Sequence, residues 1–207
     1  VQGWSVVGPV SNVEVTVRGK VETHDQNGVL RGHKELVSPH CYLQATALTH
    51  PEGPLLALAQ EALGVENALD AAHLLAEKVA DAIVWTPGST RSQTTAAEAM
   101  AQAQGVCQDH AHALIAAARA AGMPARYVSG YMLAEGRQDA AHAWAEVHVK
   151  ALGWVGFDPA NGCCPDDRYI RVASGLDAQD AAPIRGSARG EGSEKLEVEV
   201  AVRTAQQ

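Results

Sequence analysis

At positions 105–110 the chain reads Gly105-Val106-Cys107-Gln108-Asp109-His110, and the residues that follow predict a helix with the cysteine in its first turn. Strong helix formers continue from Cys107 to Ala121, and Gly122 and Pro124 then end the helix. The apolar residues after the cysteine recur at the spacing of one helical face: Ala111, Leu114, Ile115 and Ala118. A free thiol has a pKa of about 8.5, and the N–H groups and partial positive charge of a helix N-terminus stabilise a thiolate. Cys107 is therefore a candidate nucleophile.

Two later segments supply a histidine and an aspartate. Residues 142–149 alternate in the manner of a strand, with His142, Trp144, Glu146 and His148 on one face. Residues 154–158 read as a second short strand, joined to the first by a hairpin through residues 150–152. In the antiparallel pairing that we predict, Trp144 lies opposite Gly156 and His142 lies opposite Asp158. Directly opposite residues have Cβ atoms about 4.5–5.5 Å apart, so the Asp158 carboxylate can accept a hydrogen bond from the imidazole.

These three residue types together predict acyl-transfer chemistry. His142 takes the thiol proton or holds it as an imidazolium beside the thiolate, and Asp158 fixes the tautomer of the ring and stabilises its charge. The thiolate of Cys107 then attacks an amide or ester carbonyl and forms a thioester. Water as the acyl acceptor makes the protein a hydrolase, and an amine makes it a transferase. The backbone N–H of Cys107 is a candidate donor to the oxyanion.

Four blocks of the sequence resemble the bacterial transglutaminase-like superfamily, whose members are often described as cysteine proteases. The blocks are GVCQDHAH at 105–112, GMPARYVSGY at 122–131, HAWAE at 142–146 and GWVGFDP at 153–159, and the resemblance is strongest from about Trp85 to Arg171. It implies a papain-like α+β fold, the transglutaminase core, in which the helix that carries the nucleophile packs on an antiparallel sheet. It also implies that Cys107 is the nucleophile, His142 the base and Asp158 its orienting group. Substrate and acceptor do not follow from it, and no cofactor or calcium site is carried over.

Domain organisation follows from the pattern along the chain. Residues 1–50 are expected to form a small or truncated N-terminal β module that includes an alternating strand at Val13–Val21, and residues 51–207 the catalytic core. Helices are predicted at 55–63, 67–83 and 96–104. The tail at 195–203 alternates between apolar and charged residues, which predicts a strand that pairs with the N-terminal one.

Composition excludes some classes of partner. The formal net charge of the 207 residues is -8, whereas binding to nucleic-acid phosphates needs clustered Lys and Arg. No apolar stretch approaches the roughly 20 residues that span a bilayer. The expected partner is a peptide or protein substrate, with no nucleic acid and no membrane. Four cysteines that we expect to be ordinary thiols, apart from Cys107, favour a cytoplasmic protein.

Alternatives remain open for each of these residues. Cys107 alone could be a small buried residue, and the chain could be a binding module with a relic triad. Asn161 is a rival orienting group for His142, because an amide can take that role. A metal site is a further alternative: its candidate ligands are His110, His112 and Asp109, with Cys107 on the same helical face as His110, and Cys163-Cys164 could complete the set. A thiolate held by zinc would not attack a carbonyl. Trp144 and Trp154 are expected as walls of the cleft or as core residues. The two readings of the triad that we favour are a protease or amidase and a protein-glutamine transglutaminase.

Overall fold

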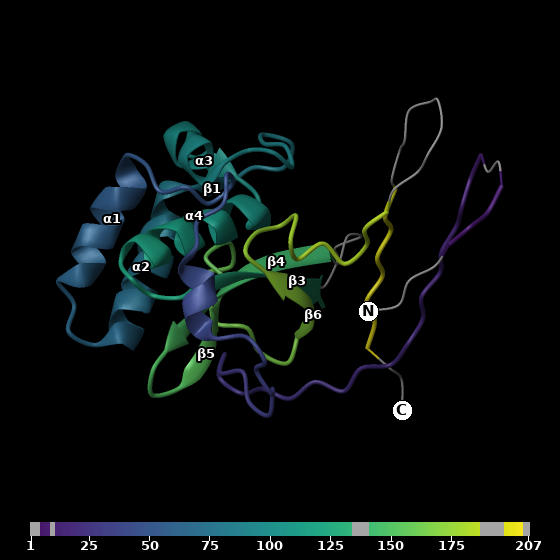
Figure 1. The fold of residues 1–207 in the computed structure, drawn as a ribbon, viewed down its shortest axis with the longest axis horizontal. Coiled ribbons are helices and arrows are strands. Elements are labelled where there is room, and N and C mark those ends of the chain that lie inside the picture. Colours follow the sequence, from purple (N-terminus) through teal and green to yellow (C-terminus); the bar gives the residue numbers. More distant parts are fainter. Residues whose placement is uncertain (1–4, 9–10, 134–140, 187–196, 205–207) are drawn as a thin grey trace.

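A helix packed on one face of an antiparallel sheet organises the fold (Figure 1). The structure is a computed structural model that describes residues 5–8, 11–133, 141–186 and 197–204. Its α-helices within these ranges are α1 (Pro54–Leu63), α2 (Ala68–Ala82), α3 (Ala96–Gln102) and α4 (Cys107–Ala120). Each of the predicted helices is therefore confirmed to within two residues. None of the described helices combines the length and the apolar character needed to cross a membrane.

Local capping explains where these helices begin and end. The side chain of Asn67 accepts a hydrogen bond from the N–H of Leu69 at 2.8 Å and so starts α2. Thr95 and Glu98 form a reciprocal capping box at the start of α3. α4 ends at Ala120, and Gly122, whose φ of 78° lies in the left-handed region, turns the chain away, so that the N–H of Met123 bonds to the carbonyl of Ala118 at 2.9 Å.

The main sheet has the strand order β5-β4-β3-β6. Its strands are β3 (Ala125–Met132), β4 (Ala141–Val149), β5 (Gly153–Phe157) and β6 (Tyr169–Gly175), and neighbouring strands are antiparallel. A short parallel pair, β1 (Val84–Trp85) and β2 (Gln104–Gly105), leads directly into α4, and a 3-10 turn, η1, spans Pro39–Leu43. The thiol-bearing helix thus follows a tethered segment rather than a free loop.

The predicted register of the β4–β5 hairpin is wrong by two residues. Val149 pairs with Gly153 and Glu146 pairs with Gly156, so Trp144 is not opposite Gly156 and His142 is not directly opposite Asp158. The loop lies at 150–152 as predicted, and a three-residue loop there places Val149 opposite Gly153, whose φ is 83°. The predicted pairing of Trp144 with Gly156 did not agree with that loop. Because the error is an even number, every side chain keeps its predicted face, and His142 and Asp158 become diagonal neighbours.

α4 is the centre of the core. It is buried from Asp109 to Arg119, which is typical of a helix covered on all sides, and α1, α2 and α3 pack around it while the sheet covers its remaining face (Figure 1). Leu114 and Ile115 are fully buried, and a truncation of either to alanine would cost about 2–5 kcal/mol. The sheet contributes the apolar side chains of one face of β4, namely Ala143, Ala145, Val147 and Val149. His142 and Trp144 therefore lie on the face of β4 that is turned away from this core.

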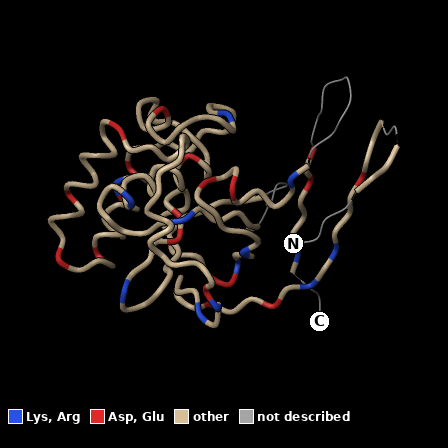
Figure 2. The backbone as a smooth tube through the Cα atoms, viewed as in Figure 1, with Lys and Arg blue, Asp and Glu red and all other residues tan. Residues whose placement is uncertain are grey.

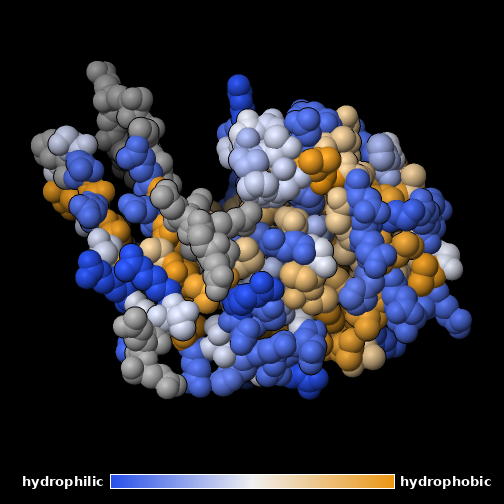
Figure 3. Space-filling view, turned by 180° about the vertical axis from the view of Figure 1, so that it is seen from behind, coloured by the Kyte–Doolittle hydropathy of each residue, from blue (hydrophilic) through white to orange (hydrophobic). Residues whose placement is uncertain are grey.

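The N-terminal part of the chain joins the sheet only at its end. Val29 pairs with Val155, and the N–H of Leu30 bonds to the carbonyl of Trp154 at 2.9 Å, so residues 28–30 extend the sheet beyond β5. The strand predicted at Val13–Val21 is not observed, and the described part of the predicted tail strand, 197–203, is not a strand either. Residues 195 and 196 lie outside the described residues. Both segments project from the core, and their apolar side chains, among them Val15, Val17 and Val198, are exposed (Figures 1 and 3).

Candidate active site

The position of Cys107 is set by the segment in front of it. The carboxylate of Asp109, which is fully buried, accepts hydrogen bonds from the N–H of Val106 at 2.8 Å and from the hydroxyl of Thr90 at 2.6 Å. Gly105 leaves room for this carboxylate, because a Cβ atom there would lie 2.7 Å from the Cβ of Asp109. Cys107 is half-buried at the first turn of α4, as predicted.

His110 and His112 hold backbone groups. The two ring nitrogens of His110 lie 2.9 Å from the carbonyl oxygens of Val106 and Ile83, which ties the approach to Cys107 to the end of α2. The Nε2 atom of His112 accepts the N–H of Ala178 at 3.1 Å, and burial lowers the pKa of His112 to about 4. Among the described residues, no group of three or more His, Cys, Asp or Glu side chains is placed to hold a metal ion.

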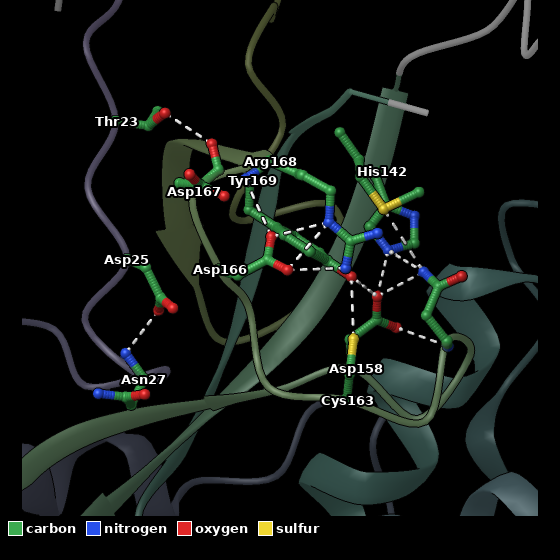
Figure 4. A network of polar contacts seen from close by, with 12 residues as sticks. Thr23, Asp25, Asn27, His142, Asp158, Cys163, Asp166, Asp167, Arg168 and Tyr169 are labelled. Atoms are coloured by element: carbon green, nitrogen blue, oxygen red, sulfur yellow. Dashed lines mark hydrogen bonds and ion pairs between the residues drawn. The ribbon is translucent and has the colours of Figure 1, made fainter. Parts of the chain in front are cut away.

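His142 and Asp158 are in direct contact. The Nε2 atom of His142 lies 2.6 Å from the Oδ2 atom of Asp158, and both side chains are buried (Figure 4). Burial by itself lowers the pKa of His142, but hydrogen bonds to Asp158 and to Cys107 and the charges of both partners raise it to about 9. Because Nε2 is used by Asp158, Nδ1 is the ring nitrogen left for the Cys107 sulfur. The arrangement favours the imidazolium form of His142, paired with the Asp158 carboxylate.

Asp158 is held by more groups than the sequence predicted. Its Oδ2 atom also accepts the Nδ2 group of Asn161 at 2.7 Å and the hydroxyl of Tyr169 at 2.8 Å (Figure 4). Burial raises the pKa of Asp158, and the hydrogen bonds from His142, Asn161 and Tyr169 outweigh this effect and lower it. Asn161, which sequence reasoning gave as a rival of Asp158, bonds to Asp158 itself, and its Nδ2 atom lies 3.2 Å from Nε2 of His142.

Two aromatic rings enclose the imidazole. Trp144 is stacked on His142 with a centroid distance of 6.3 Å, and Tyr169 meets it edge-on at 5.7 Å. The two rings contact one another at 5.4 Å and belong to a small apolar cluster with Val128 and Met132. Gly130 is required beside them, because a Cβ there would collide with the Trp144 ring and with the carbonyl oxygen of Ile170. Trp144 is thus a wall of the site, and Tyr169 is a site residue that no sequence motif pointed to.

Trp154 belongs to a different part of the sheet. The guanidinium carbon of Arg126 lies 3.9 Å from the centroid of its ring, and Arg126 is paired with Glu146 at 2.6 Å and with Glu35 at 2.5 Å. A pocket of about 380 Å³ opens here, with walls that include His33, Glu35, His148 and Trp154. It is lined by none of Cys107, His142 and Asp158, so this pocket lies apart from the contact between His142 and Asp158.

Comparison with known proteins places the chain among relatives. The sequence profile of the Transglutaminase-like superfamily matches residues 56–159, half of the chain, including Cys107, His142 and Asp158. An uncharacterised protein of Mycobacterium leprae is 36% identical over 128 residues, which cover 57% of this chain and 44% of that protein. A protein-glutamine gamma-glutamyltransferase of Pseudomonas aeruginosa is 35% identical over 82 residues, 35% of this chain and 12% of that protein. The chain thus spans less than half the length of these curated relatives.

A solved structure agrees with the predicted fold. The crystal structure of a candidate cysteine protease from Cytophaga hutchinsonii matches with a TM-score of 0.63 and 29% identity, over 77% of this chain and 55% of that one. The α+β prediction, with a thiol-bearing helix packed on an antiparallel sheet, is confirmed. With its profile matched from Leu56 to Pro159, the chain belongs to the transglutaminase-like superfamily.

Proposed function

We propose that the protein is a cysteine-dependent acyl-transfer enzyme that forms a thioester on Cys107. The observation that carries this proposal is the buried imidazole of His142, which lies 2.6 Å from Asp158 and whose pKa is raised to about 9 by Asp158 and Cys107 together. A His pKa above neutrality stabilises the imidazolium at pH 7, and an imidazolium beside a sulfur stabilises the thiolate. Cys107, His142 and Asp158 then act as nucleophile, acid–base group and orienting group.

The reaction has two halves. The Cys107 thiolate attacks the carbonyl carbon of an amide, the C–N bond breaks, and the proton of the His142 imidazolium goes to the leaving amine, so that a thioester remains. A water molecule then gives a proton to the neutral His142 and attacks the thioester, and the C–S bond breaks to release the acid and restore the thiolate. Asp158 stays ionised throughout and keeps Nε2 protonated. The backbone N–H of Cys107 at the start of α4 is one donor to the oxyanion.

Hydrolysis of peptide-like bonds is the first candidate, and transfer to an amine is the second. The similarity to the candidate cysteine protease covers 77% of this chain, which supports a protease or amidase. The shorter similarity to the gamma-glutamyltransferase, over 35% of the chain, supports a transglutaminase that passes the acyl group to an amine. A binding module with a relic triad would not need the contact of His142 with Asp158, nor the two further donors on that carboxylate.

Partners and compartment follow from the same proposal. A peptide or protein is the proposed substrate, with no cofactor. Nucleic acid is not a proposed partner, because the net charge is -8 and the described Lys and Arg are spread among Asp and Glu (Figure 2). A membrane is not a proposed partner either. The cytoplasm is the proposed compartment, supported by the free thiols of all four cysteines.

The experiment uses p-nitrophenyl acetate as a generic acyl donor. We expect a burst of p-nitrophenol equal to about one per protein, an added acetyl group on the Cys107 peptide by mass spectrometry, and no burst with Cys107→Ala or His142→Ala. Cys41→Ala, which removes an exposed thiol, is the matched control. Alkylation of Cys107 at the rate and pH dependence of Cys41 would overturn the proposal. Incubation with casein then separates the candidates, because a protease creates new N-termini and a transglutaminase incorporates a fluorescent amine.

A further inference from the structure

Tyr169 connects the Asp158 carboxylate to a second thiol. Its hydroxyl donates to Oδ2 of Asp158 at 2.8 Å, and the same hydroxyl oxygen lies 3.4 Å from the sulfur of Cys163 (Figure 4). Burial and the nearby Asp158 raise the pKa of Tyr169, so the hydroxyl keeps its proton and gives it to the carboxylate. Burial also raises the pKa of Cys163, so its S–H remains available to donate to the Tyr169 oxygen. The direction of the chain is therefore Cys163 to Tyr169 to Asp158.

This series of hydrogen bonds ends on Oδ2 of Asp158, an oxygen that also accepts hydrogen bonds from other side chains. Oδ2 of Asp158 accepts His142 at 2.6 Å, Asn161 at 2.7 Å and Tyr169 at 2.8 Å, while Oδ1 accepts only the more distant N–H of Asn161 at 3.3 Å. A carboxylate oxygen offers about two lone pairs, so three donors compete for it. Each donor that draws on the charge of Oδ2 weakens its attraction for the others.

We propose that Tyr169 is a positioning residue that limits the attraction of Asp158 for His142, so that the imidazolium remains acidic enough to protonate the leaving amine. The proposal rests on the proposed function, because it gives His142 the acid–base role. Tyr169 touches no reacting atom and acts through Asp158. Its ring also packs against His142 and Trp144, but the ring would hold the imidazole equally well without the hydroxyl.

Other charged groups near this chain are accounted for. His142 faces Asp158 from β4, and Cys107 faces His142 from α4. In the loop that precedes Tyr169, Arg168 is paired with Asp166 at 2.7 Å; Arg168 is exposed and Asp166 is half-buried. Their charges act on the pKa of Cys163 in opposite directions. Thr23 bonds to the carbonyl of Asp167 at 2.6 Å and adds no charge (Figure 4). The hydroxyl of Tyr169 is thus the group on this side that bears directly on the carboxylate.

The test is Tyr169→Phe, which keeps the ring and removes the hydroxyl. The rate of alkylation of Cys107 by iodoacetate is measured against pH by mass spectrometry of the Cys107 peptide, because the carboxylate of this reagent is attracted by the imidazolium. The rate then falls where His142 loses its proton. We expect that alkaline limb to move up by about 0.5 pH unit. Turnover of p-nitrophenyl acetate at pH 7 should fall about threefold, because the neutral imidazole that activates water for deacylation becomes about three times rarer. A hydroxyl with a merely structural role would leave the limb in place.

Controls separate this inference from the proposed function. Tyr42→Phe removes a hydroxyl from η1, where the ring contacts Trp154 and not His142, and should leave the limb unchanged. Cys163→Ala removes the donor to the Tyr169 oxygen and should move the alkaline limb up as well, by a smaller amount. Cys164→Ala should leave the limb in place. The two cysteine variants also test the inference if Tyr169→Phe does not fold. A limb that stays in place or moves down in Tyr169→Phe overturns the inference alone. A parent protein in which Cys107 alkylates as an ordinary thiol overturns the proposed function first.

Discussion

Replacement of Asp158 by asparagine should lower the pKa of His142 more than any other single change in this fold. Among the groups that raise that pKa from its ordinary 6.5 to about 9, the hydrogen bond to Asp158 is the largest, followed by the one to Cys107. The difference between 6.5 and about 9 corresponds to about 3 kcal/mol in favour of the imidazolium. If half or more of this belongs to Asp158, Asp158→Asn should lower the pKa of His142 by about 1–2 units.

The iodoacetate profile of Cys107 measures this effect directly. The alkaline limb should move from near pH 9 in the parent to between about 7 and 8 in Asp158→Asn, and acyl transfer should fall by about 10³–10⁴-fold because the amide no longer fixes the tautomer. Asp177→Asn is the matched control: Asp177 is another buried carboxylate, and it acts on His112 rather than on His142. An unchanged limb in Asp158→Asn, with the protein folded, would refute the assignment of Asp158 as the partner of His142.

Three further perturbations test stability. The pKa of His142 is raised in the folded state, so the stability that its protonation adds is complete below pH 6.5 and is lost as the pH rises through about 9. The free energy of unfolding in urea should fall by up to about 3 kcal/mol across this window, and His142→Gln should abolish the fall. Arg119 is buried and donates to the carbonyls of Tyr42, Ala125 and Leu176. Arg119→Met should therefore lower the free energy of unfolding by about 3 kcal/mol in the same assay. An unchanged urea midpoint would show that these carbonyls find other donors. Gly130→Ala should reduce the melting temperature strongly, because its Cβ would collide with a backbone oxygen of β6, whereas Gly19→Ala, with open space around it, should not.

The parts of the fold that sequence predicted are those with a local cause. α4 could be located from its apolar periodicity and from Gly122, because the residues that bury the helix lie within it and the glycine that ends it follows directly. The face of β4 that carries His142 could be predicted from alternation alone. The register follows from the loop as well, because a turn at 150–152 places Val149 opposite Gly153. The predicted pairing of Trp144 with Gly156 did not agree with that loop and was wrong by two residues.

The parts that sequence did not predict depend on distant contacts. Tyr169 reaches Asp158 across an eleven-residue separation in an irregular loop, and no periodicity records such a contact. Alternation at 13–21 predicted a strand, but a strand also needs a partner, and Val15 and Val17 are exposed in the structure. Arg126 and Glu35 show the reverse case: they are 91 positions apart and form an ion pair that binds the N-terminal part of the chain to β3.

His142 and Asp158 lie in a single hairpin, and this has a consequence for the order of folding. His142 and Asp158 are 16 positions apart on β4 and just beyond β5, whereas Cys107 arrives from a separate helix. Hairpins close within microseconds, but a helix must find its sheet through slower, more distant contacts. We expect the imidazole and carboxylate to be paired early and the sulfur to join them last. A nascent chain would then carry an unreactive thiol, and the onset of Cys107 reactivity would mark the moment at which the helix has docked.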